Sequence, residues 1–231
     1  MHKINKREPP RHLELWKQKF EDENGREPVY DDLIGTEEYI LLKQELVEEQ
    51  GYICCYCEKR IGLPGAPDCD IEHFMPRHPD KKRLTPDQYA VCRNAQLDYG
   101  NMLASCRGEA LYVLDHCNHR KENWFDFDVC VSPASPEIES LFRFRLNGKM
   151  VEAESNSGAD EMIKQLNLNS FILCEQRRAA YEAVLDTDFD EVELQYDETY
   201  LADTIACYRQ MDENGRYTPF CSMITYCLRA Y

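Results

Sequence analysis

The stretch DIEHFMP, residues 70–76, places an acidic residue beside a histidine and ends on a proline. The carboxylate of Glu72 can bind a hard cation through oxygen, and the imidazole of His73 can accept a proton from water near neutral pH. We therefore expect a short strand over residues 70–74 whose end presents both side chains to one phosphate. A Glu–His pair alone is also common on ordinary surfaces, so its meaning depends on the neighbouring sequence.

Cysteines flank this stretch on both sides. Cys54 and Cys57 form a C-x-x-C turn before it, and Cys106 and Cys117 follow it. Structural zinc takes four ligands in a tetrahedron, so we predict a structural Zn²⁺ site made of these four thiols. Cys55 overlaps the turn and is a rival ligand. The alternative is that all of them are ordinary buried cysteines, because a single C-x-x-C is weak evidence for a metal.

Two further polar clusters complete the pattern: DYGNMLASC at residues 98–106 and HCNHRK at residues 116–121. The order C-x-x-C, acid–His–x–x–Pro, Asn–apolar–Leu, Cys and Cys–Asn–x–x–Lys resembles the HNH nucleases, which have the ββα-metal fold. The resemblance covers about residues 54–121. It implies an α+β protein in which a ββα-metal HNH core with a structural zinc knuckle is flanked by an N-terminal helical segment and a mainly helical C-terminal region.

Motifs outside the core narrow the resemblance. KINK at residues 3–6 with the following Pro9-Pro10, LVEEQ at 46–50, QLNLN at 165–169 and Arg177-Arg178 are similar to the PtuB-type HNH proteins of Septu anti-phage systems and of some retron systems. This resemblance implies an anti-phage effector that cuts DNA together with a PtuA-type ATPase, which itself resembles ABC and SMC ATPases. In a retron system, the assembly would also contain retron RNA–DNA.

The resemblance also implies a role for each site residue. His73 is the general base, and Glu72 and Asn118 bind one catalytic divalent ion, Mg²⁺ or Mn²⁺. Asn101 holds the loop backbone that orients His73, and Lys121 contacts the phosphate. Simpler HNH proteins often have histidine at the position of Asn118, so His116 and His119 remain rivals for that ligand.

The charge balance bears on substrate binding. The chain has 27 Lys and Arg against 43 Asp and Glu, a net charge of −16. Phosphate attraction needs clustered cations, so we expect a partner to supply part of the grip on DNA, with Arg77, Arg120 and Lys121 as local substrate contacts. An equally simple reading is that the acid keeps the protein soluble and that these cations belong to a solvated loop and helix face.

The motifs and the resemblance together imply three regions of the chain. Residues 1–50 are expected to form a helical arm, residues 51–128 the zinc-stapled nuclease core, and residues 129–231 a hairpin followed by helices. Caps are expected at Thr36 and Thr85.

In the C-terminal region, Asn147-Gly148 is expected to form the turn of a hairpin over residues 141–151. Amphipathic helices should follow it. The expected apolar positions are Phe142, Phe144, Leu146, Ile163, Leu166, Phe171, Cys174, Tyr181, Leu185, Phe220, Met223, Ile224, Cys227 and Leu228.

Two other function classes are compatible with the sequence. One is a zinc-ribbon module that binds nucleic acid or protein without chemistry, and the other is an adaptor whose helices at residues 159–231 bridge larger proteins. The sequence does not distinguish DNA from RNA as the substrate. No run of roughly 18 or more apolar residues occurs, and no secretory signal precedes the first helix. We therefore expect a cytoplasmic protein whose 12 cysteines stay reduced.

Overall fold

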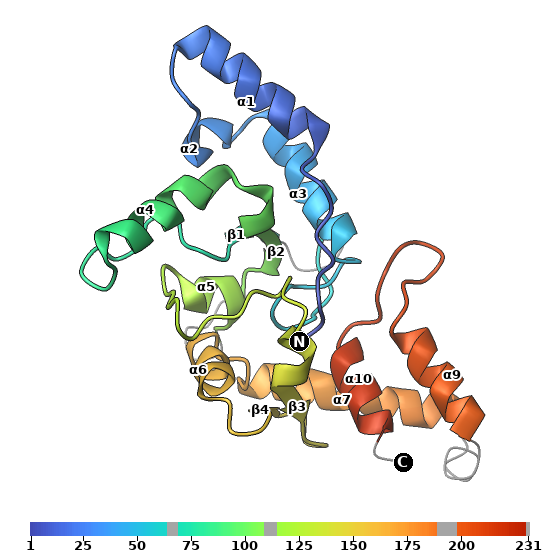
Figure 1. Cartoon of the computed structure of the whole chain (residues 1–231). Coiled ribbons are helices and arrows are strands. Elements are labelled where there is room, and N and C mark those ends of the chain that lie inside the picture. Colours follow the sequence, from blue (N-terminus) through green and yellow to red (C-terminus); the bar gives the residue numbers. More distant parts are fainter. Residues whose placement is uncertain (64–68, 109–114, 189–197, 230–231) are drawn as a thin grey trace.

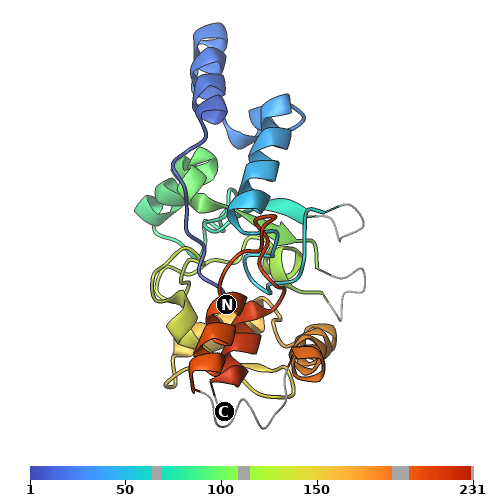
Figure 2. The same ribbon diagram turned by 90° about the vertical axis from the view of Figure 1, so that its right-hand side faces the viewer.

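The computed structural model describes residues 1–63, 69–108, 115–188 and 198–229. The protein is mixed α/β and elongated, with helices at both ends and a small sheet between them (Figures 1 and 2). The strands are β1 (Cys69–His73), β2 (Met102–Cys106), β3 (Phe142–Phe144) and β4 (Met150–Glu152). The helices are α1 (Arg11–Asn24), α2 (Tyr30–Leu33), α3 (Glu37–Glu49), α4 (Pro86–Asn94), α5 (Cys117–Lys121), α6 (Ser157–Gln165), α7 (Phe171–Asp188), α9 (Glu198–Tyr208) and α10 (Cys221–Leu228), with 3-10 turns η1 (Ala95–Leu97), η2 (Tyr99–Asn101) and η4 (Ile138–Leu141).

The N-terminal helices follow the sequence signals closely. The Oγ1 atom of Thr36 accepts a hydrogen bond from the Tyr39 backbone N–H at 3.2 Å, which confirms the predicted cap of α3. Leu42 and Leu46 are fully buried on the inner face of this helix. The helix ends at Glu49, and Gly51 follows in the left-handed region at φ 60°, as expected for a helix stop.

The central sheet consists of β1 and β2, paired antiparallel, and the predicted strand is confirmed. Cys69 lies opposite Cys106 at one end of the sheet, and His73 lies opposite Met102 at the other. The connection between the two strands contains α4, whose first turn is held by the predicted Thr85 cap. After β2 the chain returns to the sheet as α5, so β1, β2 and α5 form one packed unit (Figure 1).

The predicted hairpin is confirmed as β3 and β4, with one correction. Phe142 and Phe144 are buried, but Leu146 lies beyond the end of β3 and is 65% exposed. Gly148 has φ +79°, and a Cβ there would lie 1.9 Å from the carbonyl oxygen of Cys174. Only glycine can make so close a turn against α7.

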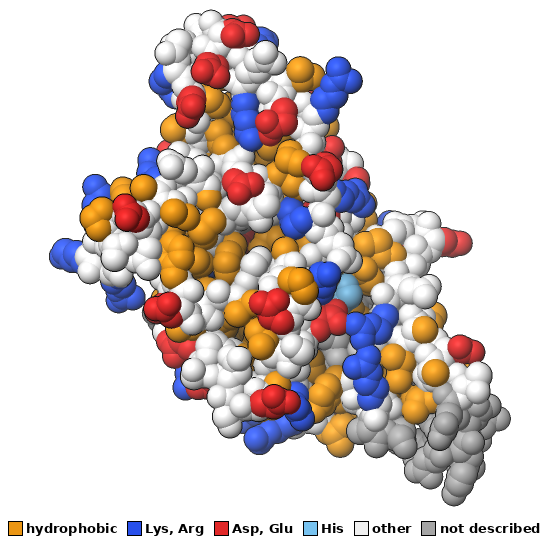
Figure 3. Space-filling model, viewed as in Figure 1, with side chains coloured by type: hydrophobic (Ala, Val, Ile, Leu, Met, Phe, Trp, Pro, Cys, Tyr) orange, Lys and Arg blue, Asp and Glu red, His pale blue; other side chains and the backbone are white. Residues whose placement is uncertain are grey.

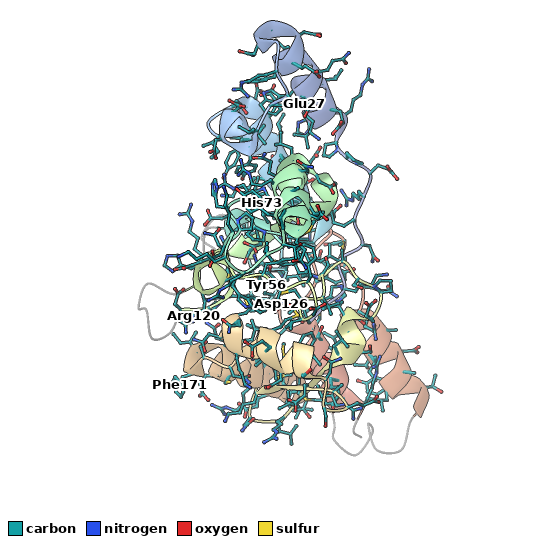
Figure 4. All side chains as sticks on the ribbon, turned by 60° about the vertical axis from the view of Figure 1, so that its left-hand side comes forward. Glu27, Tyr56, His73, Arg120, Asp126 and Phe171 are labelled. Atoms are coloured by element: carbon teal, nitrogen blue, oxygen red, sulfur yellow. The ribbon has the colours of Figure 1, made fainter. Side chains whose placement is uncertain are left out.

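The C-terminal helices form as expected, again with one correction. In α10, Met223, Ile224 and Leu228 are fully buried, which confirms the predicted apolar stripe. Phe171 begins α7 and is 70% exposed, so its predicted place on the buried face is wrong; Leu173 takes that place and is fully buried. Figure 4 shows Phe171 at the edge of the molecule. Among the described residues, no helix has the length and apolar character needed to cross a membrane.

Candidate active site and metal centre

Four buried cysteines meet at one end of the central sheet. Cys54, Cys57, Cys106 and Cys117 have their Sγ atoms within 4.8 Å of one another. Zn–S bonds of about 2.3 Å in a tetrahedron require sulfur atoms roughly 3.8 Å apart, and the Sγ atoms of Cys57 and Cys106 are 3.7 Å apart. The set of four thiols can therefore hold a metal ion such as zinc, and it leaves no open position for a substrate.

The C-x-x-C turn is shaped by its own backbone. The N–H of Cys54 donates to the carbonyl of Lys59 at 2.9 Å, and the N–H of Glu58 donates back to the carbonyl of Cys54 at 3.0 Å. Glu58 takes the left-handed conformation at φ 64°, which folds the chain back after the second thiol. The backbone N–H of Cys55 donates to Ala104 on β2 at 3.1 Å, and the thiol of Cys55 is not a member of the cluster.

Cys117 is positioned by the loop between α6 and α7. Its backbone N–H donates to the carbonyl of Leu166 at 3.0 Å, and the side-chain amide of Asn167 donates to the carbonyl of Asp115 at 2.7 Å. The buried guanidinium of Arg177 donates to the carbonyls of Leu168 and Gly148 at 2.7 and 3.0 Å. The QLNLN segment thus connects the thiol cluster to the β3–β4 hairpin.

The thiols share their protons unequally. Burial opposes ionisation, but hydrogen bonds from the Cys106 and Cys117 thiols hold the pKa of Cys54 well below its ordinary value. The pKa of Cys57 is lowered to about 7, because the same two donors outweigh the effect of burial. Burial and the neighbouring thiols raise the pKa of Cys117. A thiolate is therefore available near neutral pH, as metal binding requires.

The two histidines that were rivals for the Asn118 position lie elsewhere. His116 is fully buried, and its Nδ1 lies 3.1 Å from the Cys117 sulfur and 3.7 Å from the Cys106 sulfur. It faces the thiol cluster. His119 is 70% exposed and pairs with the carboxylate of Asp115.

His73 lies at the opposite end of the sheet and is 6% exposed. Its Nε2 lies 3.0 Å from the carbonyl oxygen of Gln96. Because a carbonyl oxygen only accepts, Nε2 is the donor, and the lone pair of the neutral ring is on Nδ1. Burial lowers the pKa of His73 to about 3. The ring is therefore neutral at physiological pH, with its lone pair on Nδ1.

Asn101 holds the chain next to His73. Its Oδ1 accepts from the backbone N–H of Met75 at 2.7 Å, and its Nδ2 donates to the carbonyls of Met75 and Ala95 at 3.0 Å each. The backbone carbonyl of Asn101 also accepts from Phe74 at 3.0 Å. One buried amide thus fixes the segment that follows His73, in keeping with the positioning role expected for it.

Glu72 and Lys121 form a buried ion pair. The Lys121 Nζ lies 2.8 Å from Oε1 of Glu72 and donates to the carbonyl of His73 at 2.9 Å. The Tyr56 hydroxyl donates to the same Oε1 at 2.9 Å. Burial raises the pKa of Glu72, and the charge of Lys121 partly offsets this. Lys121 was expected to contact phosphate; its side chain is instead 2% exposed and directed at Glu72.

A cavity of about 300 Å³ brings the predicted residues together. Glu72, His73 and Asn118 all line it. Asn118 comes from α5 and is half-buried. Among the described residues, its side-chain amide has no hydrogen-bond partner. The three residues thus share one solvent-accessible space, with His73 in the interior of the molecule (Figure 4).

Sequence reasoning missed the contribution of the N-terminal arm to this cavity. The Tyr30 ring packs edge-on against His73, with the ring centroids 4.4 Å apart. Arg77 lines the cavity, lies 4.4 Å above the Tyr30 ring and pairs with Asp31 at 2.5 Å. Burial raises the pKa of Tyr30, so its hydroxyl remains protonated. No sequence motif links the Tyr30 segment to His73, because their contact depends on tertiary packing.

Arg120 lies outside this cavity. Its side chain is exposed on α5 and lines a second, neighbouring cavity, and Figure 4 shows it at the outer surface, away from His73. Arg77 and Arg120 are therefore on different cavities, although both were expected to contact substrate.

A scan against models of protein families and a search of curated proteins both find no match to this chain. The resemblance to HNH nucleases thus comes from the motifs of residues 54–121 and the flanking segments of this sequence. Their geometry is the basis for a functional proposal.

Proposed function

We propose that this protein is a metal-dependent HNH endonuclease that hydrolyses phosphodiester bonds of DNA. The order β1, long connection, β2 and α5 is the order expected of a ββα-metal core, and the four thiols support a structural zinc ion beside it. The observation that carries the proposal is that His73, with Nδ1 as acceptor, lines the same cavity as Glu72 and Asn118.

The oxygen ligands in this cavity are compatible with Mg²⁺ or Mn²⁺. Asn118 offers an amide oxygen that no described residue engages, and Glu72 offers a carboxylate. Hard cations of this kind bind to a few protein oxygens and keep several waters. When bound, the ion would neutralise charge on the phosphate and on the departing 3′-oxygen. Oε1 of Glu72 is paired with Lys121, so Oε2 is the atom best suited as its ligand.

The chemistry of this chain's own residues follows from the tautomer of His73. Nδ1 takes a proton from the attacking water, and the imidazolium that forms is held in place through Nε2–H and the Gln96 carbonyl. Asn101 prevents the segment after His73 from moving away from the phosphate. The edge-on Tyr30 ring covers one side of the imidazole and limits the access of water.

A plasmid-nicking assay tests this function. Supercoiled plasmid is incubated with the protein and Mn²⁺ or Mg²⁺, with EDTA, and with a His73→Ala variant. We expect nicking that requires the metal and that falls roughly 10²–10⁴-fold in the variant, which is the usual contribution of a general base. Equal nicking by both proteins would contradict the proposal.

We further propose an ATPase of the PtuA type as partner and an anti-phage defence role in the cytoplasm. The net charge of −16 supports a partner that supplies part of the DNA grip. Co-purification of the two proteins is the test, and a chain that remains free at micromolar concentrations of both would contradict it.

A second candidate function is a zinc-stapled binding module without chemistry. It is favoured by the burial of Glu72, whose carboxylate is 3% exposed and already paired with Lys121. In that case Glu72 is a structural residue, and DNA or protein binding would persist without metal-dependent cleavage. The nicking assay, combined with a DNA-binding assay in EDTA, separates the two functions.

A further inference from the structure

A second cavity adjoins the candidate active site. Its volume is about 280 Å³, and its walls include Pro76, Glu122 and Asn123, which also line the His73 cavity. The two spaces therefore meet along a shared wall. A nucleic-acid strand with a phosphate at His73 would reach the second cavity by crossing this shared wall.

The walls of the second cavity combine aromatic and amide groups. Trp124 and Phe125 line it, and both are half-buried. Phe125 is fixed between two other rings: its centroid lies 5.3 Å from that of Phe74 and 4.9 Å from that of Phe127, both in edge-on geometry. Aromatic side chains of this kind are what proteins use to stack unpaired bases.

Polar groups at the rim match a nucleotide. Asn123 is exposed, and Gln165 donates through Nε2 to Glu161, which leaves its Oε1 as an acceptor. Asn123 has both a donor and an acceptor for the edge of a base. Arg120 and Arg83 supply charge for the adjoining phosphates.

Two acidic residues, Asp80 and Glu122, also line this wall. Asp80 is engaged in its own loop, where it accepts from the backbone N–H of Lys82 at 2.9 Å and lies 3.6 Å from Arg83. Figure 3 shows Lys and Arg side chains gathered around the segment before α4, and a hydrophobic surface between α4 and the segments below it. On a chain of net charge −16, these clustered cations beside a hydrophobic surface suit an anionic, partly apolar ligand.

We propose that this second cavity, lined by Trp124, Phe125 and Arg120, holds an unpaired nucleobase next to the phosphate that is cut. The inference rests on the proposed nuclease function and adds to it: the substrate is single-stranded, or has a base turned out of its duplex, at the cut site. The stacked base sets the register of the strand, and the phosphate is thereby brought to His73.

Fluorescence of Trp124 tests this directly. The chain has two tryptophans, so a Trp16→Phe variant of the full-length protein leaves Trp124 as the only indole. Short single-stranded DNA, added with Ca²⁺ in place of Mn²⁺, is expected to quench this fluorescence. An abasic site at one position of the oligonucleotide should weaken binding by about 5- to 150-fold, the range that follows from the stacking free energy of one base on an aromatic side chain. No quenching, or equal affinity for every abasic position, would overturn the inference.

Variants provide a second test. Trp124→Ala should weaken binding by the same factor, whereas Trp124→Phe should retain most of the parental affinity. Phe171→Ala removes an exposed ring on α7 and should leave the affinity unchanged. If Trp124→Ala fails to fold, the abasic series on the parent protein still decides. Cleavage that ignores base removal overturns this inference alone, whereas base-dependent binding without cleavage overturns the nuclease proposal alone.

Discussion

The thiol cluster and the His73 cavity border the same two-stranded sheet, but they differ in whether their polar groups already have partners. At the Cys106 end, the four thiols are all buried, and their Sγ atoms lie within 4.8 Å of one another. At the His73 end, the cavity is open to solvent and the Asn118 amide has no partner among the described residues. The thiol cluster therefore has the geometry of a structural metal site. The His73 cavity instead has a polar side chain, Asn118, that a ligand can bind.

Removing one thiol of the four-cysteine cluster should have the largest effect on stability. Cys106→Ser removes one of four ligands, and metal binding in structural zinc sites is worth about 10–16 kcal/mol, as much as the ~5–15 kcal/mol stability of a whole domain. We expect loss of bound zinc and of a cooperative thermal transition, measured by elemental analysis and circular dichroism. Cys207→Ser, at an exposed thiol, is the matched control and should keep both. Unchanged zinc content in Cys106→Ser would refute the assignment.

The buried ion pair at the His73 end should give the next largest effect. Lys121→Met leaves the Glu72 carboxylate buried without its cation, at a cost of about 3–5 kcal/mol. The double variant Glu72→Gln/Lys121→Met should recover most of this, because no charge is then left unpaired. Urea unfolding of the two single variants and the double variant measures the coupling. Additive losses would show that the two residues do not interact.

Substitution of Asn101 should have a smaller effect, which lowers both the free energy of unfolding and the rate of cleavage. Asn101→Asp removes both donors to the carbonyls of Met75 and Ala95 and should cost roughly 1–3 kcal/mol for the groups left unsatisfied. Cleavage should fall through kcat more than through KM, since Asn101 positions His73 and does not touch substrate. Asn214→Asp, in an exposed loop, serves as the control. An unchanged kcat would remove the positioning role.

The smallest effect should appear in the pH dependence of stability. Burial lowers the folded-state pKa of His73 to about 3 from an ordinary value of 6.5, so between these values the unfolded chain binds more protons. Stability from this group is present above pH 6.5 and is lost as the pH falls, by at most ~1.4 kcal/mol per pH unit. Urea unfolding at pH 7 and 5.5 should show this loss in the parent, and His73→Ala should remove that part of it.

The sequence predicted the local features of both ends and few of the long-range ones. The Thr36 and Thr85 caps, β1 and the C-x-x-C turn follow from short motifs whose chemistry is local. The four-thiol set is a long-range feature that was predicted because zinc needs four ligands. The resemblance implied that Asn101 holds the loop beside His73, and its side chain bonds to the backbone of Met75. No local sequence motif predicts that Tyr30 covers His73, because that contact depends on how the N-terminal arm packs.

Tertiary packing also explains two side chains whose positions differ from the sequence predictions. Lys121 was expected at the substrate, but the close approach of α5 to β1 directs it to Glu72. Phe171 fits a helical apolar pattern, but the core beneath α7 is filled by Leu173, so the ring at the helix start remains in solvent. In both cases the periodicity identified the helix, and the neighbouring elements decided which way a side chain points.

The comparison of the two ends is tested most directly by measuring metal-dependent nicking, zinc content and thermal melting on one preparation of His73→Ala. The account predicts that nicking with Mn²⁺ falls at least about 100-fold, while zinc content and the cooperative melt are retained, as they are in a His12→Ala control on α1. Nicking at the parental rate by a folded, zinc-loaded His73→Ala protein would contradict it.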